Sequence, residues 1–152
     1  MAEVRIYADG SSLGNPGQGG WAYVIVGPDG ALLGEAGSDP AATNNVMELT
    51  AAFMALSALK EGDTGTLFTD SKYVVLGLTQ WRPGWEKRGM RKADNKPVAN
   101  AEYWTALYAL ADALPGIEIR WVKGHAGNAY NELVDAHAQR AAREQSPCHP
   151  IP

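Results

Sequence analysis

Four acidic residues stand where expected strands or helices would expose a side chain, namely Asp9, Glu48, Asp70 and Asp135. Asp9 ends a run that alternates like a strand, and a turn rich in Gly, Asn and Pro follows it. Asp70 ends a second strand-like run, whereas Glu48 and Asp135 lie in segments with helical spacing of apolar residues. Mg²⁺ prefers such carboxylate oxygens and needs few of them when phosphate and water complete its shell. Four together would suit two ions about 4 Å apart that activate a water against a phosphodiester.

Each of these acidic residues also has a simpler interpretation. Asp9 precedes Gly10, as in many turns, and Asp70 precedes a helix that it could cap. Glu48 follows Asn45 by three residues and could complete a capping box, and Asp135 could lie on a solvated helix face. An acidic cluster that binds Ca²⁺, or no ion at all, fits the same residues. The residue types alone therefore leave the two-metal site as one of several interpretations.

The pattern of the chain predicts an α/β fold with a mixed five-stranded sheet flanked by helices. After the strand that ends at Asp9, strands are expected at 21–26, 31–36, 64–69 and 117–122. The first three would form an antiparallel meander, and the first, fourth and fifth would be parallel. Helices are expected at about 43–61, 71–78, 100–114 and 131–144. The C-terminal ends of the parallel strands would then place Asp9, Asp70 and the loop of His125 at one edge, where α/β proteins usually carry their sites.

The bulk composition indicates one domain and a localised basic surface. The 152 residues carry a net charge of −4, but residues 81–96 hold six cations against two carboxylates, so this segment is strongly basic. Such a patch on an acidic body suits a nucleic-acid partner, although a solvated loop is the simpler alternative. The glycines fit neither a dinucleotide-binding nor a P-loop motif. A single cysteine, Cys148, and the lack of a signal or membrane-spanning stretch favour a cytoplasmic monomer.

Several motifs, in the same order along the chain, resemble ribonuclease HI. They are Tyr7-Ala8-Asp9-Gly10-Ser11 with Gly14-Asn15-Pro16-Gly17, Thr43-Asn44-Asn45-Val46-Met47-Glu48-Leu49, Thr69-Asp70-Ser71 with Tyr73-Val74, Trp121-Val122-Lys123-Gly124-His125-Ala126-Gly127, and Asn131-Glu132 with Asp135. The resemblance extends from about Val4 to Ala142 and leaves the C-terminal tail uncovered. It implies a catalytic domain over residues 1–145, with a basic protrusion at about 81–96. Residues 146–152, which include three prolines, are expected to be a disordered tail.

The resemblance implies an endonuclease that cuts the RNA strand of RNA–DNA hybrids and leaves 5′-phosphate and 3′-hydroxyl ends. Its metal ligands would be Asp9, Glu48, Asp70 and Asp135, holding two Mg²⁺ ions, with Mn²⁺ as a substitute. Asp9 would bridge both ions, and Glu48 would also touch a 2′-hydroxyl. His125 would assist proton transfer or product departure, since histidine changes charge near neutral pH. The simpler alternative for His125 is a surface loop residue.

The resemblance also implies a set of substrate contacts. Asparagine side chains would contact the two strands in the minor groove, where the 2′-hydroxyl distinguishes RNA from DNA. A threonine and an asparagine would hold a DNA phosphate, and the protrusion would lie along the DNA backbone. The residues are Asn15, Asn44 and Asn45 for the groove, Thr43 and Asn100 for the phosphate, and Trp81, Trp85, Lys87 and Arg88 for the protrusion. For the two tryptophans, packing within the protrusion is the alternative.

Departures from the family pattern concern hybrid affinity and leave the carboxylates intact. Ala41 replaces an arginine near the phosphate pocket, Glu86 replaces a cation, and Met90 replaces an aromatic residue. Two other functions remain open at this point. One is a nuclease of the same fold that acts on DNA alone, and the other is a hybrid-binding module without catalysis.

Overall fold

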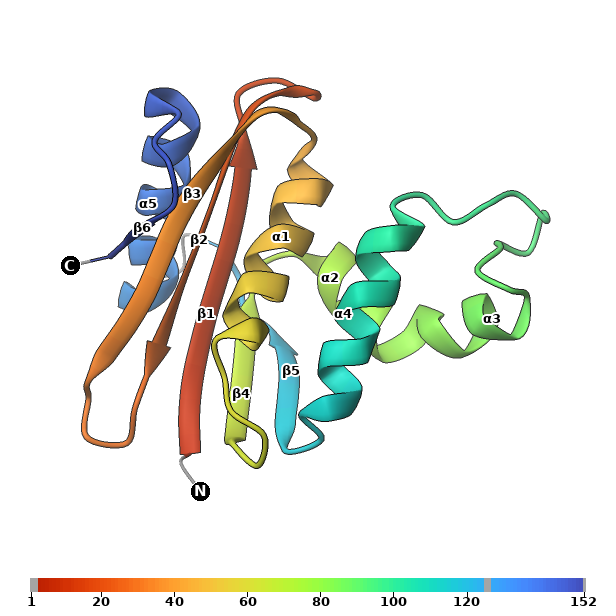
Figure 1. Ribbon diagram of the computed structural model, residues 1–152, viewed down its shortest axis with the longest axis horizontal. Helices are drawn as coiled ribbons and strands as arrows, with labels where there is room; N and C mark the ends of the chain where they lie inside the picture. Colours follow the sequence, from red (N-terminus) through yellow and green to blue (C-terminus); the bar gives the residue numbers. More distant parts are fainter. Residues whose placement is uncertain (1–2, 125–126, 152) are drawn as a thin grey trace.

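The computed structural model describes residues 3–124 and 127–151, and its centre is one mixed sheet (Figure 1). The strand order is β5-β4-β1-β2-β3-β6. β1 to β3 pair antiparallel, and β4 and β5 run parallel to β1. The strands are β1 Glu3–Ser12, β2 Gly17–Val26, β3 Leu32–Ala42, β4 Thr64–Thr69, β5 Ile117–Trp121 and β6 His149–Pro150. The predicted mixed sheet is confirmed, with β6 as an additional strand.

Helices cover both faces of the sheet, which explains why its central strands are buried on both sides. Ile6 of β1 packs towards α1 and α4, whereas its neighbour Tyr7 packs towards α5. This alternation follows from the two-residue period of a strand. The helices are α1 Asn44–Ser57, α2 Lys72–Leu76, α3 Arg82–Lys87, α4 Ala101–Ala113 and α5 Ala129–Glu144, with the π-helical turn η1 Gly77–Trp81 before α3. Within the described ranges, none of these helices is long and apolar enough to cross a membrane.

β1 is longer than the sequence pattern predicted, so Asp9 lies inside the strand and not at its end. β2 pairs with β1 as far as Ser12↔Gly19, which extends the ladder three residues beyond Asp9. The parallel pairing with β4 stops earlier, at Tyr7↔Phe68. Beyond Tyr7, the edge of β1 that faces β4 is no longer paired with it, and Asp9 lies on this part of β1. The sequence predicted that Asp9 would lie at the end of a strand, and the strand that ends beside it is β4.

The C-terminal residues differ from the disordered tail that the prolines suggested. His149 and Pro150 pair antiparallel with β3, and the Ile151 N–H donates to the Gly34 carbonyl at 2.9 Å. The side chain of Ile151 packs against the apolar cluster beneath α5. Proline is tolerated here because β6 is an edge strand, where a missing N–H leaves no ladder bond unmade. The expectation of disorder is therefore corrected for residues 146–151.

Removal of residues 146–152 is expected to lower the free energy of unfolding by about 1 kcal/mol, because it exposes apolar surface under Ile151 and unpairs the β3 edge. The part of the sheet formed by β4 and β5 should be unaffected, because β6 lies at the opposite edge. Urea denaturation of the full-length and shortened chains measures the difference. Identical midpoints would mean that this strand contributes nothing to stability.

Candidate metal-binding active site

Three of the four predicted carboxylates converge where β1 opens away from β4. Asp9 comes from β1, Glu48 from α1, and Asp70 from the residue directly after β4. One oxygen of each lies within 4.8 Å of the others. Asp9 is only 4% exposed, whereas Glu48 and Asp70 are half-buried, so the cluster faces solvent through these two residues. Side chains that are 22 or more residues apart in sequence thus form one acidic centre.

Gly10 explains how α1 comes close enough to β1 to deliver Glu48. A Cβ at this position would lie 2.2 Å from the carbonyl carbon of Met47, so only glycine allows the helix backbone to rest on the strand. The Gly10 N–H lies 3.0 Å from Asp9 Oδ1 and 2.5 Å from Glu48 Oε1. This single donor therefore fixes both carboxylates. The side chain that caps α1 is Thr43, so the capping-box interpretation of Glu48 does not hold.

Asp70 is held through its backbone and leaves its carboxylate to the cluster. The Trp121 indole N–H donates to the Asp70 carbonyl at 3.1 Å. Ser71, and not Asp70, caps α2, because its Oγ accepts from the Val74 N–H at 3.2 Å. A Cβ at Gly124 would lie 2.8 Å from Asp70 Oδ2, so this glycine lets the loop after β5 approach the carboxylate. Trp121 and Gly124 belong to a motif that resembles ribonuclease HI, but the motif itself does not indicate that they contact Asp70.

Asp135 reaches the same centre from α5, on the other face of the sheet. It is half-buried, and its two oxygens accept from Gln139 Nε2 at 3.2 and 3.1 Å. Together with burial, its proximity contributes to the raised pKa values of Asp9 and Glu48, although it is not part of the tight group of three. The fourth predicted carboxylate therefore adjoins the cluster. The remaining predicted catalytic residue, His125, lies outside the described residues.

The clustering makes ionisation of the inner carboxyl groups unfavourable. Burial is the main cause that raises the pKa of Asp9 far above the usual carboxyl range, and the charges of Glu48 and Asp70 add to it. Burial also raises the pKa of Glu48, although its bonds to Asp9 and the Gly10 N–H oppose the shift. A donor set made only of hard carboxylate oxygens fits a divalent cation, which would offset these repelling charges. Strongly shifted carboxyls of this kind are typical of functional sites.

Two of the predicted groove asparagines join the turn after β1 to the start of α1. The Asn44 N–H donates to Asn15 Oδ1 at 3.1 Å, and Asn44 Oδ1 accepts from the Ser12 N–H at 2.8 Å. Asn15, Asn44 and Asn45 are all exposed, and Asn44 and Asn45 begin α1, the helix that also carries Glu48. Thr43 uses its hydroxyl to accept from the Val46 N–H at 3.1 Å. The structure thus gathers these four polar residues at the N-terminus of α1.

Of the four residues of the protrusion that were predicted to contact substrate, two pack against other side chains and two are exposed to solvent. Trp81 and Trp85 are half-buried, with ring centroids 5.3 Å apart, and Trp85 lies 5.6 Å from the buried Trp104. Lys87 and Arg88, by contrast, are exposed at the end of α3. The packing interpretation of the tryptophans is therefore realised, while part of each indole still faces solvent.

Asn100 is bound within the protein in this structure. It adopts a left-handed backbone conformation with φ of 60° directly before α4. Its Nδ2 donates to the hydroxyl of Tyr73 at 3.1 Å, and the Trp104 indole donates to the same hydroxyl at 3.0 Å. A phosphate at this position would therefore compete with, or rearrange, the bond to Tyr73. Tyr73 belongs to one of the motifs that resemble ribonuclease HI, but its contacts with Asn100 and Trp104 are apparent only from the packing.

Comparison with known proteins identifies the family. The family model described as RNase H matches residues 1–143. A protein of Novosphingobium aromaticivorans named Ribonuclease H is 50% identical over 151 residues, covering 93% of this chain and 98% of its own. The Pseudomonas aeruginosa protein named Ribonuclease HI is 45% identical over 142 residues, covering 93% and 95% of the two chains.

Among solved structures, a similar one is the crystal structure of LC9-RNase H1, a type 1 RNase H with the type 2 active-site motif. It superposes with a TM-score of 0.86 at 30% identity, covering 99% of this chain and 78% of that one. The resemblance seen in the motifs and the expected fold class are thereby confirmed. The chain belongs to the ribonuclease H family of metal-dependent endoribonucleases.

Proposed function

We propose that this protein hydrolyses the RNA strand of RNA–DNA hybrids by two-metal-ion catalysis, leaving 5′-phosphate and 3′-hydroxyl ends. The observation that carries the proposal is the convergence of Asp9, Glu48 and Asp70, with Asp135 beside them, in a member of the ribonuclease H family. The metal is Mg²⁺, for which Mn²⁺ would substitute, because every candidate ligand is a carboxylate oxygen. We further propose that the protein works as a cytoplasmic monomer.

The four carboxylates of the cluster would differ in their roles as metal ligands. Asp9, buried on β1 and bonded to the Gly10 N–H, would be the most firmly held metal ligand. Asp70 and Asp135 would be further ligands, and Glu48 would be a ligand that also contacts a 2′-hydroxyl of the RNA. When bound, the two ions lower the pKa of the attacking water and stabilise the developing 3′-oxyanion. His125, which follows β5 in the sequence, would assist proton transfer or product departure.

Substrate choice depends on residues outside the carboxylate cluster. Asn15, Asn44 and Asn45 present neutral donors and acceptors beside Glu48, as reading of a 2′-hydroxyl in the minor groove requires. Thr43 and Asn100 hold a phosphate of the DNA strand. The exposed Lys87 and Arg88 supply charge along that strand, together with the outward parts of Trp81 and Trp85.

An end-labelled RNA–DNA hybrid tests this function against three matched controls, namely single-stranded RNA, duplex RNA and duplex DNA. Only the RNA strand of the hybrid is expected to be cut, in Mg²⁺ and not in EDTA, because cleavage needs a 2′-hydroxyl on one strand, a DNA strand for the phosphate and protrusion contacts, and the metal. Gel analysis of the products, with and without phosphatase, identifies the new ends. Products that carry 3′-phosphate would contradict a water attack that expels the 3′-oxygen.

The same assay distinguishes the two alternative functions. Cleavage of duplex DNA would identify a DNA nuclease on this fold and would make the assignment of the asparagines wrong. Binding of the hybrid without cleavage would identify a binding module that has lost catalysis.

A further inference from the structure

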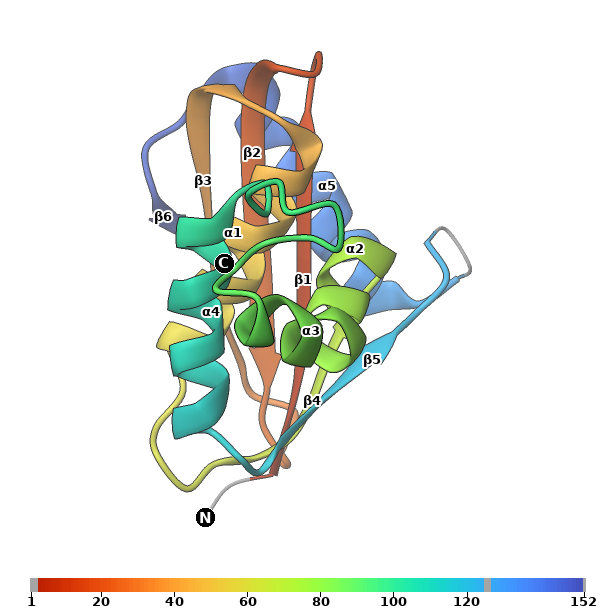
Figure 2. The same ribbon diagram turned by 90° about the vertical axis from the view of Figure 1, so that its right-hand side faces the viewer.

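The basic protrusion stands away from the sheet and meets the body of the protein at α4. Figure 1 shows α3 and the following loop projecting beside α4, on the side opposite β6, and Figure 2 shows them facing the viewer. The protrusion begins at Arg82, the first residue of α3. The way in which Arg82 is held therefore determines how the exposed cations beyond it are presented.

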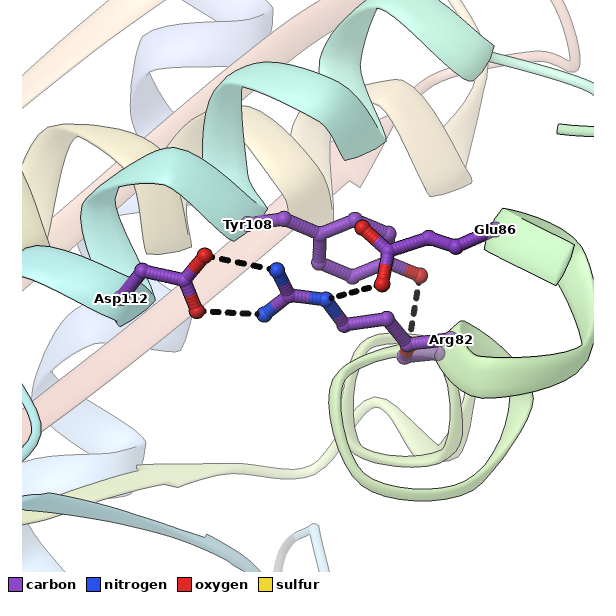
Figure 3. A network of polar contacts seen from close by, with 5 residues as sticks. Arg82, Glu86, Tyr108 and Asp112 are labelled. Carbon is purple, nitrogen blue, oxygen red and sulfur yellow. Dashed lines mark hydrogen bonds and ion pairs between the residues drawn. The ribbon is translucent and has the colours of Figure 1, made fainter. Parts of the chain in front are cut away.

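Arg82 donates a hydrogen bond within the protein from each of its three guanidinium nitrogens (Figure 3). Its Nη1 and Nη2 donate to the two oxygens of Asp112 on α4 at 2.8 and 2.7 Å. Its Nε donates to Glu86 Oε1 at 3.0 Å, one turn further along α3. The guanidinium carbon lies 4.5 Å from the ring centroid of Tyr108 on α4. Arginine favours this geometry, in which a bidentate ion pair is combined with stacking of the cation on an aromatic ring, and lysine cannot reproduce it.

Tyr108 extends this contact to the turn that precedes α3. Its hydroxyl donates to the Gly77 carbonyl at 2.7 Å, so α4 is bonded to the first residue of η1 as well as to the first residue of α3. On another side, Trp85 of α3 packs against Trp104 of α4. The indoles supply apolar contact, whereas Arg82 supplies the directional bonds that set the angle of α3 on α4.

The same contacts separate Arg82 from the other cations of the protrusion. Its side chain is only 23% exposed, and its charge is opposed by both Asp112 and Glu86. Glu86, which departs from the cation common in the family, is thereby paired inside the protrusion. The side chains of Lys87, Arg88 and Lys96 are exposed, and none of the ion pairs within the described ranges involves them. These cations are available to a phosphate backbone, and Arg82 is not.

We propose that Arg82 and Asp112 form a clamp that positions the protrusion for the DNA strand of the hybrid, a role that rests on the proposed function. Arg82 is a positioning residue and makes no contact with substrate itself. With the clamp closed, Lys87 and Arg88 are presented in a fixed orientation, and less conformational entropy is lost when the hybrid binds. With the clamp open, the same cations remain but must be ordered during binding.

The variant Asp112→Ala separates positioning from simple charge. It removes a negative charge close to the basic surface, so a purely electrostatic effect would tighten hybrid binding and lower KM. Loss of the clamp predicts the opposite, a KM raised about three- to tenfold with kcat within about twofold of the wild type. Arg82→Lys keeps the positive charge but cannot form the bidentate pair with Asp112, so it should also raise KM. The matched control is Glu118→Ala, which removes an exposed carboxylate paired with Arg120 on β5 and should change neither constant.

The salt dependence of KM distinguishes a clamp from a direct phosphate contact. For Arg82→Ala, the clamp predicts a higher KM with an unchanged slope of log KM against log salt. A slope smaller by about 0.7 to 0.9 would show that Arg82 itself neutralises a phosphate, and this would overturn the proposal. A KM for Asp112→Ala that is unchanged or lower would overturn it as well.

Amide hydrogen exchange without nucleic acid tests the clamp independently of activity. Exchange of residues 82–99 should be about threefold faster or more in Asp112→Ala than in the wild type and in Glu118→Ala, while the sheet is unaffected. Unchanged exchange in this segment would overturn the clamp. If the wild-type protein failed to cut the hybrid, the proposed function would fail, whereas this measurement would still decide whether α4 restrains the protrusion.

Discussion

Asp70→Asn is expected to lower kcat for hybrid cleavage on the order of 10³-fold or more, while KM for the hybrid changes little. The amide keeps the size of the side chain but loses the charge that holds a divalent ion. Hybrid binding should persist because the Asn15, Asn44 and Lys87 side chains are exposed elsewhere on the surface. The backbone carbonyl of residue 70 still accepts from Trp121, so the local fold should be kept. Single-turnover kinetics with the labelled hybrid, together with a binding titration, measure the two quantities.

Asp29→Asn provides the matched control for this variant. Asp29 lies in the exposed turn between β2 and β3, where its Oδ1 accepts from the Ala31 N–H, a bond that asparagine can also make. Its activity should equal that of the wild type. Comparable activity of Asp70→Asn and Asp29→Asn would remove Asp70 from the catalytic group and would leave the function without its central argument.

The sequence allowed the acidic centre to be predicted because strands and helices have fixed geometry. Alternation along β1 and the short strand-like run of β4 each end near an acidic residue, and parallel pairing of the two strands brought Asp9 and Asp70 close together. The helical stripe that includes Leu49 and Phe53 turned α1 towards the same sheet, which carried Glu48 with it. These relations depend only on period and order, which are visible in a sequence.

Features that depend on close approach between distant segments could not be predicted in this way. The contact of Gly10 with α1 requires a helix backbone to rest on a strand, and a glycine in a motif does not state which neighbour needs the space. The simple interpretation of Glu48 as a cap was excluded only when Thr43 was seen to hold that position. The last strand was missed because prolines argue against regular structure, yet an edge position accepts them.

The protrusion shows a further limit of counting charges along a chain. Arg82 and Glu86 were counted separately in the net charge of residues 81–96, although they form one internal pair with Asp112 as a second acceptor. Asp112 lies 30 residues from Arg82, and nothing local in the sequence connects them. The surface charge that a nucleic acid would meet is therefore set by the fold as much as by the composition.

Asp9→Asn is expected to abolish cleavage and, without metal, to raise the free energy of unfolding at pH 8 on the order of 2 kcal/mol, or about 5 °C in Tm. Burial raises the pKa of Asp9, so the folded protein holds a proton that the unfolded chain has released above its ordinary pKa of about 4. The folded state therefore binds more protons, and stability falls as pH rises from about 4 through the neutral range. Asparagine removes this penalty, and its Oδ1 can still accept from the Gly10 N–H.

Mg²⁺ should reverse this pH dependence in the wild type and have far less effect in Asp9→Asn. A bound divalent ion favours the ionised carboxylates, so the gain in Tm on saturating Mg²⁺ should be larger at pH 8 than at pH 5, where protons compete for the same oxygens. Thermal unfolding of both proteins at the two pH values, with Mg²⁺ and with EDTA, gives the four differences needed. A wild-type Tm that is indifferent to Mg²⁺ at pH 8 would contradict a cluster that is strained by its own charge. An equal gain in Asp9→Asn would place the ion elsewhere in the protein.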